Sequence, residues 1–167
     1  RLILSRLSPD DAPFILELVN EPDWLRFIGD RGVHDLDGAR TYIEKVRVGM
    51  YARHGFGLYK VSSKSDATPL GMCGLLKRDS LPDADIGFAF LARHRGRGFA
   101  YEAALATLGH GRRDFGLERI LAITDPANES SIRLLQKLGF RFVERLHLEG
   151  HGGDSNLYEH LPADPGI

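Results

Sequence analysis

The segment RHRGRGFAYEAA, residues 93–104, gathers residue types that together bind anions. Three arginines supply positive charge, and two glycines remove side chains that would hold a ligand away from the backbone. A helical pattern begins directly after the second glycine, and the first turn of a helix carries unpaired N–H groups and a partial positive charge. Phosphate and pyrophosphate are the ligands that this combination favours. The residues expected to form the anion site are Arg93, Arg95, Gly96, Arg97 and Gly98.

Two familiar phosphate motifs do not fit this segment. A Walker A loop needs a Gly-Lys-Ser/Thr sequence and the dinucleotide fingerprint needs a third glycine, and neither is present here. The chain has a formal net charge of −1 and a pI of about 6.7, so the arginines form only a local patch. Because nucleic-acid-binding domains usually show a basic face and a high pI, no nucleic-acid partner is expected.

Hydrophobic periodicity predicts the elements that position this segment. Apolar patterns indicate strands at residues 1–7, 56–62, 70–78, 84–92, 118–124, 140–148 and 155–161. Amphipathic patterns and capping signals indicate helices at residues 8–20, 22–28, 98–114 and 126–138, and one that Asp35 or Asp37 opens and that reaches about residue 54. This order predicts one α/β domain over residues 1–167, with a mixed, mostly antiparallel central sheet flanked by helices. The strands at Asp85 and Arg119 are joined through a helix, so this pair is expected to be parallel.

Four segments resemble the GNAT superfamily of acetyl-CoA-dependent N-acetyltransferases. Residues 95–100, RGRGFA, match the R-x-x-G-x-A pyrophosphate signature of that family. DPANESSIRLLQKLGFRFVERL, residues 125–146, is similar to its second signature, most closely in the branch that acetylates ribosomal-protein N-termini. DIGFAFL, residues 85–91, and the opening RLILSRLSPDDAPFILEL resemble the same branch. The resemblance therefore covers nearly the whole chain in the right order.

The resemblance implies where acetyl-CoA would bind. Its pyrophosphate would lie on the backbone N–H groups of residues 95–100. Its pantetheine arm would pair with the free edge of the strand at residues 85–91, where two adjacent parallel strands splay apart. Leu91 and its neighbours would supply N–H groups to the thioester oxygen, and the acceptor amine would attack the thioester without a covalent enzyme intermediate. The residues expected on this basis to bind the cosubstrate are Phe90, Leu91, Arg93, Arg95, Gly96, Arg97, Gly98, Phe99, Ala100, Asn128 and Ser131.

Asp85 is a candidate general base for the reaction that the resemblance implies. It stands where the family branch often carries a glutamate, and a carboxylate there could take the amine proton directly or through water. It could equally be a strand-end residue that solvates the preceding turn, and Asp83 is a neighbouring alternative. An α-amine with a pKa near 7.7–8.0 is roughly 10% neutral at pH 7, so it needs a base less than a lysine does.

The proton donor for the leaving thiolate differs from the common family pattern. Many family members use a tyrosine in the second signature, and Leu135 occupies that position here. In the ribosomal-protein branch, the serine three residues after the asparagine is the substitute candidate, which is Ser131. Ser131 could instead support the first helical turn. Asn128 could act as an N-cap, as a pantetheine ligand, or as both.

Three further features have two readings each. Trp24 and Tyr51 are candidates for the acceptor pocket, because the first helices cover that side in the family, but core packing would equally explain them.

Cys73 lies in an apolar strand pattern, so a buried hydrophobe is expected rather than a nucleophile. HLEGHGGD, residues 147–154, is not an H-E-x-x-H motif, and its glycines disfavour the required helix. We expect no metal there, but a loop that borders the acceptor cleft.

The sequence therefore predicts an acetyl-CoA-dependent N-acetyltransferase with a primary amine acceptor, and a protein N-terminal α-amine is the lead. Small-molecule amines such as aminoglycosides or polyamines are the alternative, to which the acidic residues of loop 30–37 hint. A non-catalytic acyl-CoA-binding module is the third reading, because the common tyrosine is missing. The resemblance also makes a homodimer one of the expected assemblies. The single cysteine, and the absence of an apolar run of ~18–20 residues, favour a cytoplasmic protein without a membrane partner.

Overall fold

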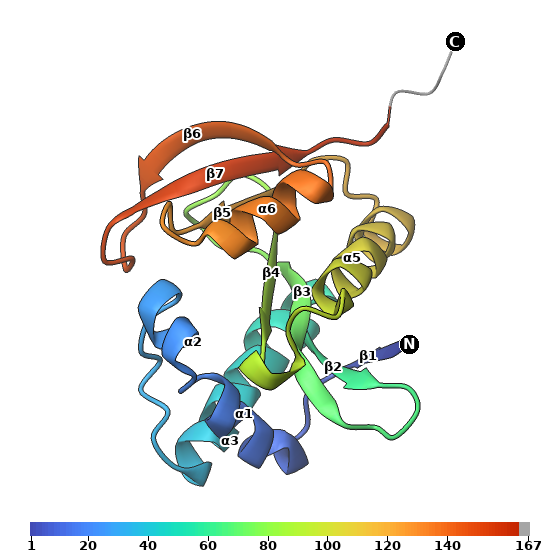
Figure 1. The fold of residues 1–167 in the computed structure, drawn as a ribbon, viewed down its shortest axis with the longest axis vertical. Helices are drawn as coiled ribbons and strands as arrows, with labels where there is room; N and C mark the ends of the chain where they lie inside the picture. Colours follow the sequence, from blue (N-terminus) through green and yellow to red (C-terminus); the bar gives the residue numbers. More distant parts are fainter. Residues whose placement is uncertain (164–167) are drawn as a thin grey trace.

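A seven-stranded sheet runs through the computed structural model, which describes residues 1–163 (Figure 1). The strand order is β1-β2-β3-β4-β5-β7-β6. Neighbouring strands are antiparallel except β4 and β5, which are parallel, so the predicted mixed and mostly antiparallel sheet is confirmed. The strands are β1 (Leu2–Ser5), β2 (Leu58–Ser63), β3 (Pro69–Leu76), β4 (Asp85–Phe90), β5 (Ile120–Thr124), β6 (Arg141–His147) and β7 (Asp154–His160).

Helices cover both faces of this sheet, because the strands near its centre bury side chains on both sides. Leu75 and Ile86 face a core formed with α5 and α6. Met72 faces a second core formed with α1, α2 and α3, which includes Ile43. The helices are α1 (Ala12–Leu18), α2 (Pro22–Phe27), α3 (Leu36–Val46), α4 (Ala52–His54), α5 (Phe99–Phe115) and α6 (Glu129–Lys137). Short helical turns are η1 (Pro9–Asp11), η2 (Arg47–Tyr51) and η3 (Ala92–His94).

The pairing of β4 differs on its two sides. Toward β3 it forms a continuous antiparallel ladder that reaches from Asp85 to Phe90. Toward β5 only Asp85 is in register, opposite Leu121, and the N–H of Leu121 donates to the carbonyl oxygen of Ala84 at 2.9 Å. The two parallel strands therefore separate beyond Asp85, as predicted, and one edge of β4 stays open from Ile86 onward.

Two predicted helices are less regular than expected. The helix at residues 8–20 begins with the 3₁₀ turn η1, where the N–H of Ser8 donates to Oδ2 of Asp11. The helix at residues 35–54 starts at Leu36, because Oδ1 of Asp35 accepts from the N–H of Gly38 at 2.6 Å. It is then interrupted by η2, a π-helical turn. No helix within residues 1–163 is both long and apolar enough to cross a membrane.

Candidate active site

The loop before α5 is shaped by two glycines, as the sequence predicts. Gly96 and Gly98 have φ angles of 78° and 80°, in a left-handed region that residues with side chains rarely adopt. Gly98 lies directly before the 17-residue helix, so the N–H groups of the first turn are presented beside this loop. A Cβ added at Gly96 would meet nothing within 4 Å, which leaves its backbone accessible to a ligand.

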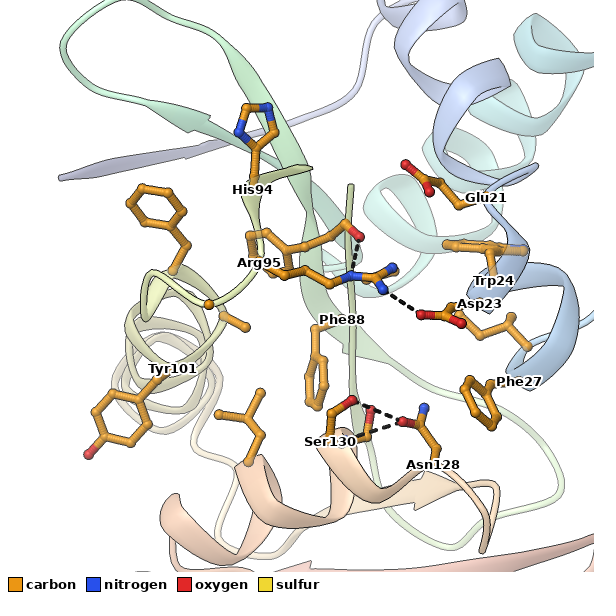
Figure 2. A pocket seen from close by; sticks show the side chains of 18 of the residues that line it. Glu21, Asp23, Trp24, Phe27, Phe88, His94, Arg95, Tyr101, Asn128 and Ser130 are labelled. Carbon is orange, nitrogen blue, oxygen red and sulfur yellow. Dashed lines mark hydrogen bonds and ion pairs between the residues drawn. The ribbon is translucent and has the colours of Figure 1, made fainter. Parts of the chain in front are cut away.

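A cleft of about 310 Å³, here called the smaller cleft, lies beside this helix start (Figure 2). Its lining includes both glycines, Phe88 and Phe90 of β4, and Trp24 of α2. Figure 2 shows Arg95 reaching from the loop toward α2, while Asn128 of the α6 start lies at another side of the same cleft. The helix start and the open edge of β4 therefore border one space.

The three arginines of the loop have different surroundings. Arg95 lines the smaller cleft, where its Nε donates to the carbonyl oxygen of Phe90 at 3.0 Å and its Nη1 to Oδ2 of Asp23 at 2.5 Å. Arg93 forms an ion pair with a glutamate of α1 and does not line the cleft. Arg97 does not line it either, and its side chain has no hydrogen bond or ion pair within residues 1–163. Of the three, the structure brings only Arg95 into the cleft.

The open edge of β4 presents alternate backbone N–H groups. The N–H of Leu91 donates to the carbonyl oxygen of Leu70 at 2.9 Å, so the expectation that it would serve the thioester oxygen is wrong. In an antiparallel ladder, successive residues direct their N–H groups to opposite sides. The N–H groups of Phe88 and Phe90 therefore face away from β3, toward the gap beside β5. These two groups, and not that of Leu91, are the strand donors that a ligand can use.

A second cleft of about 880 Å³, here called the larger cleft, adjoins the first. It is bordered by α2, α3, the ends of β3 and β4, and the loop between β6 and β7. The residues that line both clefts are Trp24, Phe27, Ile28, Phe88, Ala89, Asn128 and Ser131. We call this set the shared wall.

Asn128 fills its predicted capping role and still offers a donor to a ligand. Its Oδ1 accepts from the N–H of Ser131 at 3.3 Å and from the hydroxyl of Ser130 at 3.2 Å (Figure 2). Its Nδ2, and the hydroxyl of Ser131, have no hydrogen-bond partner in the part of the chain that the structure describes. Leu135, at the position of the family's tyrosine, is 1% exposed and packs in the core of α5 and α6.

Asp85 lines the larger cleft, although it is only 1% exposed. Its two carboxylate oxygens accept from Nε and Nη2 of Arg78, each at 2.9 Å. Burial raises the pKa of Asp85, and the hydrogen bond and charge of Arg78 oppose that shift without cancelling it. Asp83 pairs instead with Arg119 and lines neither cleft. Of the two carboxylates, only Asp85 is brought to a cleft.

The two aromatic candidates for the acceptor pocket are separated. Trp24 belongs to the shared wall and is 6% exposed, and its indole N–H has no hydrogen-bond partner within residues 1–163. Tyr51 lines neither cleft. Its hydroxyl donates to the carbonyl oxygen of Leu58 and accepts from the N–H of Leu7, and burial raises its pKa to about 12. The structure places Tyr51 in the core and outside both clefts.

Two basic residues of the larger cleft were missed in the sequence, whereas the loop at residues 147–154 was expected to border a cleft and does so. Lys77 and Arg78 follow β3 directly, and the signal that could have found them is a charged pair at the end of an apolar strand. His151 lies in the β6–β7 loop, which lines the larger cleft. Burial lowers the pKa of His151, and the nearby charges of Arg78 and Arg31 lower it further. No three His, Cys, Asp or Glu side chains gather as metal ligands among residues 1–163.

A strand edge left open beside a glycine-shaped helix start can receive an extended arm that ends in a pyrophosphate, and acyl-CoA has this form. Residues 1–141 match the family model of the acetyltransferase (GNAT) domain. The chain therefore belongs to the GNAT acetyltransferase family and is an acetyl-CoA-dependent acyltransferase, as the sequence predicts.

Related proteins of known sequence match most of the chain. YkkB of Bacillus subtilis is 29% identical over 139 residues, which cover 82% of this chain and 79% of that protein. The N-acetyltransferase YoaA of Bacillus subtilis is 26% identical over 164 residues, which cover 95% and 92%. The relatives thus extend over nearly the same length as this chain.

Solved structures share the fold. A GNAT acetyltransferase from Bacillus anthracis is 25% identical, with a TM-score of 0.79 and coverage of 96% of this chain and 95% of that chain. RimL, a ribosomal L7/L12 α-N-protein acetyltransferase in complex with coenzyme A, is 18% identical with a TM-score of 0.78, covering 96% and 93%. Spermidine N-acetyltransferase from Vibrio cholerae, in complex with CoA and spermine, is 18% identical with a TM-score of 0.77, covering 96% and 95%. At 18% identity, the last two show the fold alone.

Proposed function

We propose that this enzyme acetylates the α-amine of a protein or peptide N-terminus by direct transfer from acetyl-CoA. The shared wall is the observation that carries the proposal, because a thioester in the smaller cleft and an amine in the larger cleft would meet there. The likeness in fold to RimL, which is described as an α-N-protein acetyltransferase, supports an acceptor of this class.

The smaller cleft offers donors that suit acetyl-CoA, which supplies the acetyl group as a thioester. The N–H groups at the start of α5, with Arg95, would hold the pyrophosphate. The N–H groups of Phe88 and Phe90 and Nδ2 of Asn128 would hold the pantetheine arm and the thioester oxygen. Such fixed donors stabilise the negative charge that develops on that oxygen during attack.

Direct transfer is favoured by the position of the only cysteine in the chain. Cys73 is fully buried in the core with α5, and its Sγ lies 3.3 Å from the hydroxyl oxygen of Thr107. Burial raises the pKa of the Cys73 thiol to about 12. A thiol that is protonated and inaccessible at neutral pH is not a nucleophile, so an acyl-cysteine intermediate has no support.

Two residues at the clefts receive the proton-transfer roles in this proposal. Asp85 accepts the amine proton through water, because both of its oxygens are held by Arg78 and the side chain is buried. Ser131 donates a hydrogen bond to the sulfur of the leaving thiolate from its position in the shared wall. Asp85 thus serves the acceptor amine, and Ser131 serves the sulfur of acetyl-CoA.

A polyamine is the second candidate acceptor, because the fold is also that of a spermidine N-acetyltransferase. The acidic loop at residues 30–37 does not support it, since its carboxylates do not line the larger cleft. Asp35 caps α3, and Asp37 pairs with Arg40 at 2.8 Å. The cleft itself carries more basic than acidic side chains, which opposes a polycation.

Release of CoA from acetyl-CoA tests this function against a panel of amines. The panel contains two matched peptides. One has a free N-terminus and no lysine, and the other has a blocked N-terminus and one lysine. Spermidine and an aminoglycoside complete the panel. We expect release with the free α-amine, with kcat/KM rising with pH and levelling near about 7.7–8.0, where an α-amine loses its proton. Release with the lysine peptide, spermidine or the aminoglycoside alone would overturn the proposed acceptor. Acetyl-CoA binding without release by any amine would favour the non-catalytic module.

A further inference from the structure

The larger cleft is lined by more cationic than anionic side chains. Its cationic residues are Arg26, Arg31, Lys45, Lys77 and Arg78, and its carboxylates are Asp85, Asp125 and Asp154. This composition differs from that of the chain as a whole, whose formal net charge is −1. Positive charge is therefore concentrated on the acceptor side of the shared wall.

Internal pairing does not neutralise this excess. Asp85 is fully engaged with Arg78, and Oδ1 of Asp125 accepts from a backbone N–H of its own turn at 2.8 Å. Among residues 1–163, Nζ of Lys77 donates only to backbone carbonyl oxygens, which carry no full charge. Arg31 has no hydrogen bond or ion pair from its side chain in the described part of the chain, and it is exposed. Its guanidinium is available to a ligand.

The charge of Arg31 affects the pKa of titratable groups on two sides of the larger cleft. Burial lowers the pKa of His151 in the β6–β7 loop, and the charges of Arg78, Arg31 and His147 lower it further. The charge of Arg31 also acts on Tyr42 of α3, opposing the effect of burial on the pKa of that hydroxyl. Arg31, Tyr42 and His151 line the same larger cleft, and the arginine charges that act on His151 there are positive.

A second observation also indicates a missing hydrogen-bond acceptor. Trp24, in the shared wall, is 6% exposed, and its indole Nε1 is buried without a partner within residues 1–163. A buried N–H without a partner is uncommon, because losing water without gaining a bond is unfavourable. An acceptor oxygen of a molecule bound against Trp24 in the shared wall would give this donor a partner.

We propose that the acceptor carries a carboxylate close to its reactive amine, and that Arg31 binds this carboxylate while the amine faces the shared wall. The inference rests on the proposed function and narrows it to N-termini with an acidic side chain among their first residues. Arginine suits the task because its planar guanidinium can bind a carboxylate through two parallel hydrogen bonds. The excess positive charge of the larger cleft also repels polyamines.

Matched peptides test the inference. Peptides with free N-termini are compared in pairs that carry Glu or Gln at position 1, 2 or 3, and kcat/KM is measured for the wild type, Arg31→Gln and Arg53→Gln. Arg53 is exposed on α4, lines neither cleft and has no ion pair within residues 1–163, so it controls for the loss of one positive charge. We expect at least a tenfold preference for Glu over Gln at one position in the wild type and Arg53→Gln. Arg31→Gln should lose it through a higher KM for the Glu peptide alone.

The outcomes separate this inference from the proposed function. Equal kcat/KM for the Glu and Gln peptides, with the N-terminus acetylated, would overturn the inference and leave the proposed function standing. A preference that Arg31→Gln leaves unchanged would also overturn it. Acetylation of free glutamate or aspartate but of no peptide would support the carboxylate while overturning the protein acceptor. Acetylation of spermidine in preference to every Glu peptide would overturn both.

Discussion

Arg95 joins the loop before α5 to α2 through Asp23, with Nη1 of the arginine 2.5 Å from Oδ2 of the aspartate. Its Nε also donates to the carbonyl oxygen of Phe90, which belongs to the last residue of β4. The side chain thus lies across the smaller cleft, beside the helix start that would receive a pyrophosphate (Figure 2). A pyrophosphate carries more negative charge than Asp23, so it would compete with this aspartate for the guanidinium.

Substitutions at this pair should have unequal effects on CoA binding. Arg95→Gln removes a cation from the smaller cleft, and we expect it to weaken CoA binding about tenfold, the loss of one charge-assisted hydrogen bond. Asp23→Asn removes only the competing carboxylate of a pair that is 40% and 50% exposed, which contributes at most about 1 kcal/mol. It should therefore tighten binding by less than about fivefold. Calorimetric titration with CoA measures both, and weaker binding in Asp23→Asn would show that the aspartate positions Arg95.

The left-handed backbone at the start of α5 predicts that any side chain there lowers the free energy of unfolding. Gly98→Ala should lower the free energy of unfolding by about 1–2 kcal/mol, the strain of an L-residue at its φ of 80°. Gly109→Ala, within the same helix, is the matched control, because the nearest atom to its added Cβ is 3.9 Å away. It should raise the stability by about 0.5–1 kcal/mol. Urea denaturation measures both, and equal effects would refute the argument from φ.

Ser130 and Ser131 are adjacent, and comparing their substitutions distinguishes a catalytic role of Ser131 from a structural one. Ser131 is in the shared wall, whereas Ser130 lines only the smaller cleft and donates to Asn128. Ser131→Ala should lower kcat about 10²-fold, the usual scale for loss of one positioned hydrogen-bond donor to a developing negative charge, and leave the Kd of CoA unchanged. Ser130→Ala should change kcat by less than about threefold, because its hydroxyl is exposed. Similar values of kcat for the two variants would remove Ser131 from the mechanism.

The buried ion pair of Asp85 and Arg78 predicts the sign of a pH dependence. Burial raises the pKa of Asp85 above its unfolded value, so the folded state holds this proton more tightly than the unfolded state. The stability that it contributes is complete below the unfolded pKa of about 3.9 and is lost as pH rises through the folded pKa. The stability of the wild type relative to Asp85→Asn should therefore decrease with rising pH, while kcat is reduced in the variant.

Thermal or urea unfolding of both proteins from pH 3.5 to 8 measures this difference. Asp11→Asn is the control, because Asp11 is a buried carboxylate that pairs with Lys60 at 2.6 Å and lines neither cleft. It should lose stability without the loss of kcat. If the advantage of the wild type over Asp85→Asn grows with pH instead, the charge of Arg78 outweighs burial, and Asp85 is a structural partner of that arginine.

The sequence predicted those features of the site that depend on local backbone. Gly96 and Gly98 adopt left-handed conformations, and Asn128 caps α6 through its own side chain, since each signal acts over a few residues. The parallel pair of β4 and β5 followed from the length of the connection between them. The family resemblance, rather than periodicity, pointed to Ser131 as a site residue.

Partners far apart in the sequence could not be predicted in this way. Arg95 meets an aspartate of α2, and Arg93 meets a glutamate of α1, only because the fold brings these helices to the loop. The expectation for Leu91 failed for a different reason. Which alternate N–H groups of β4 face β3 depends on the register of the ladder, and a sequence pattern of period two does not show which set is already bonded.

The unequal edges of β4 also bear on how this protein avoids association with other chains. An unpaired strand edge at the rim of a sheet invites strand addition and aggregation. Here the open stretch lies in the middle of the strand order, between β3 and β5, and the clefts beside it are walled by α2 and the start of α6. A narrow, extended molecule can lie along it, but it does not lie at the rim of the sheet, where a strand of a folded partner would add. The fold thus keeps backbone donors ready for a ligand without exposing them to aggregation.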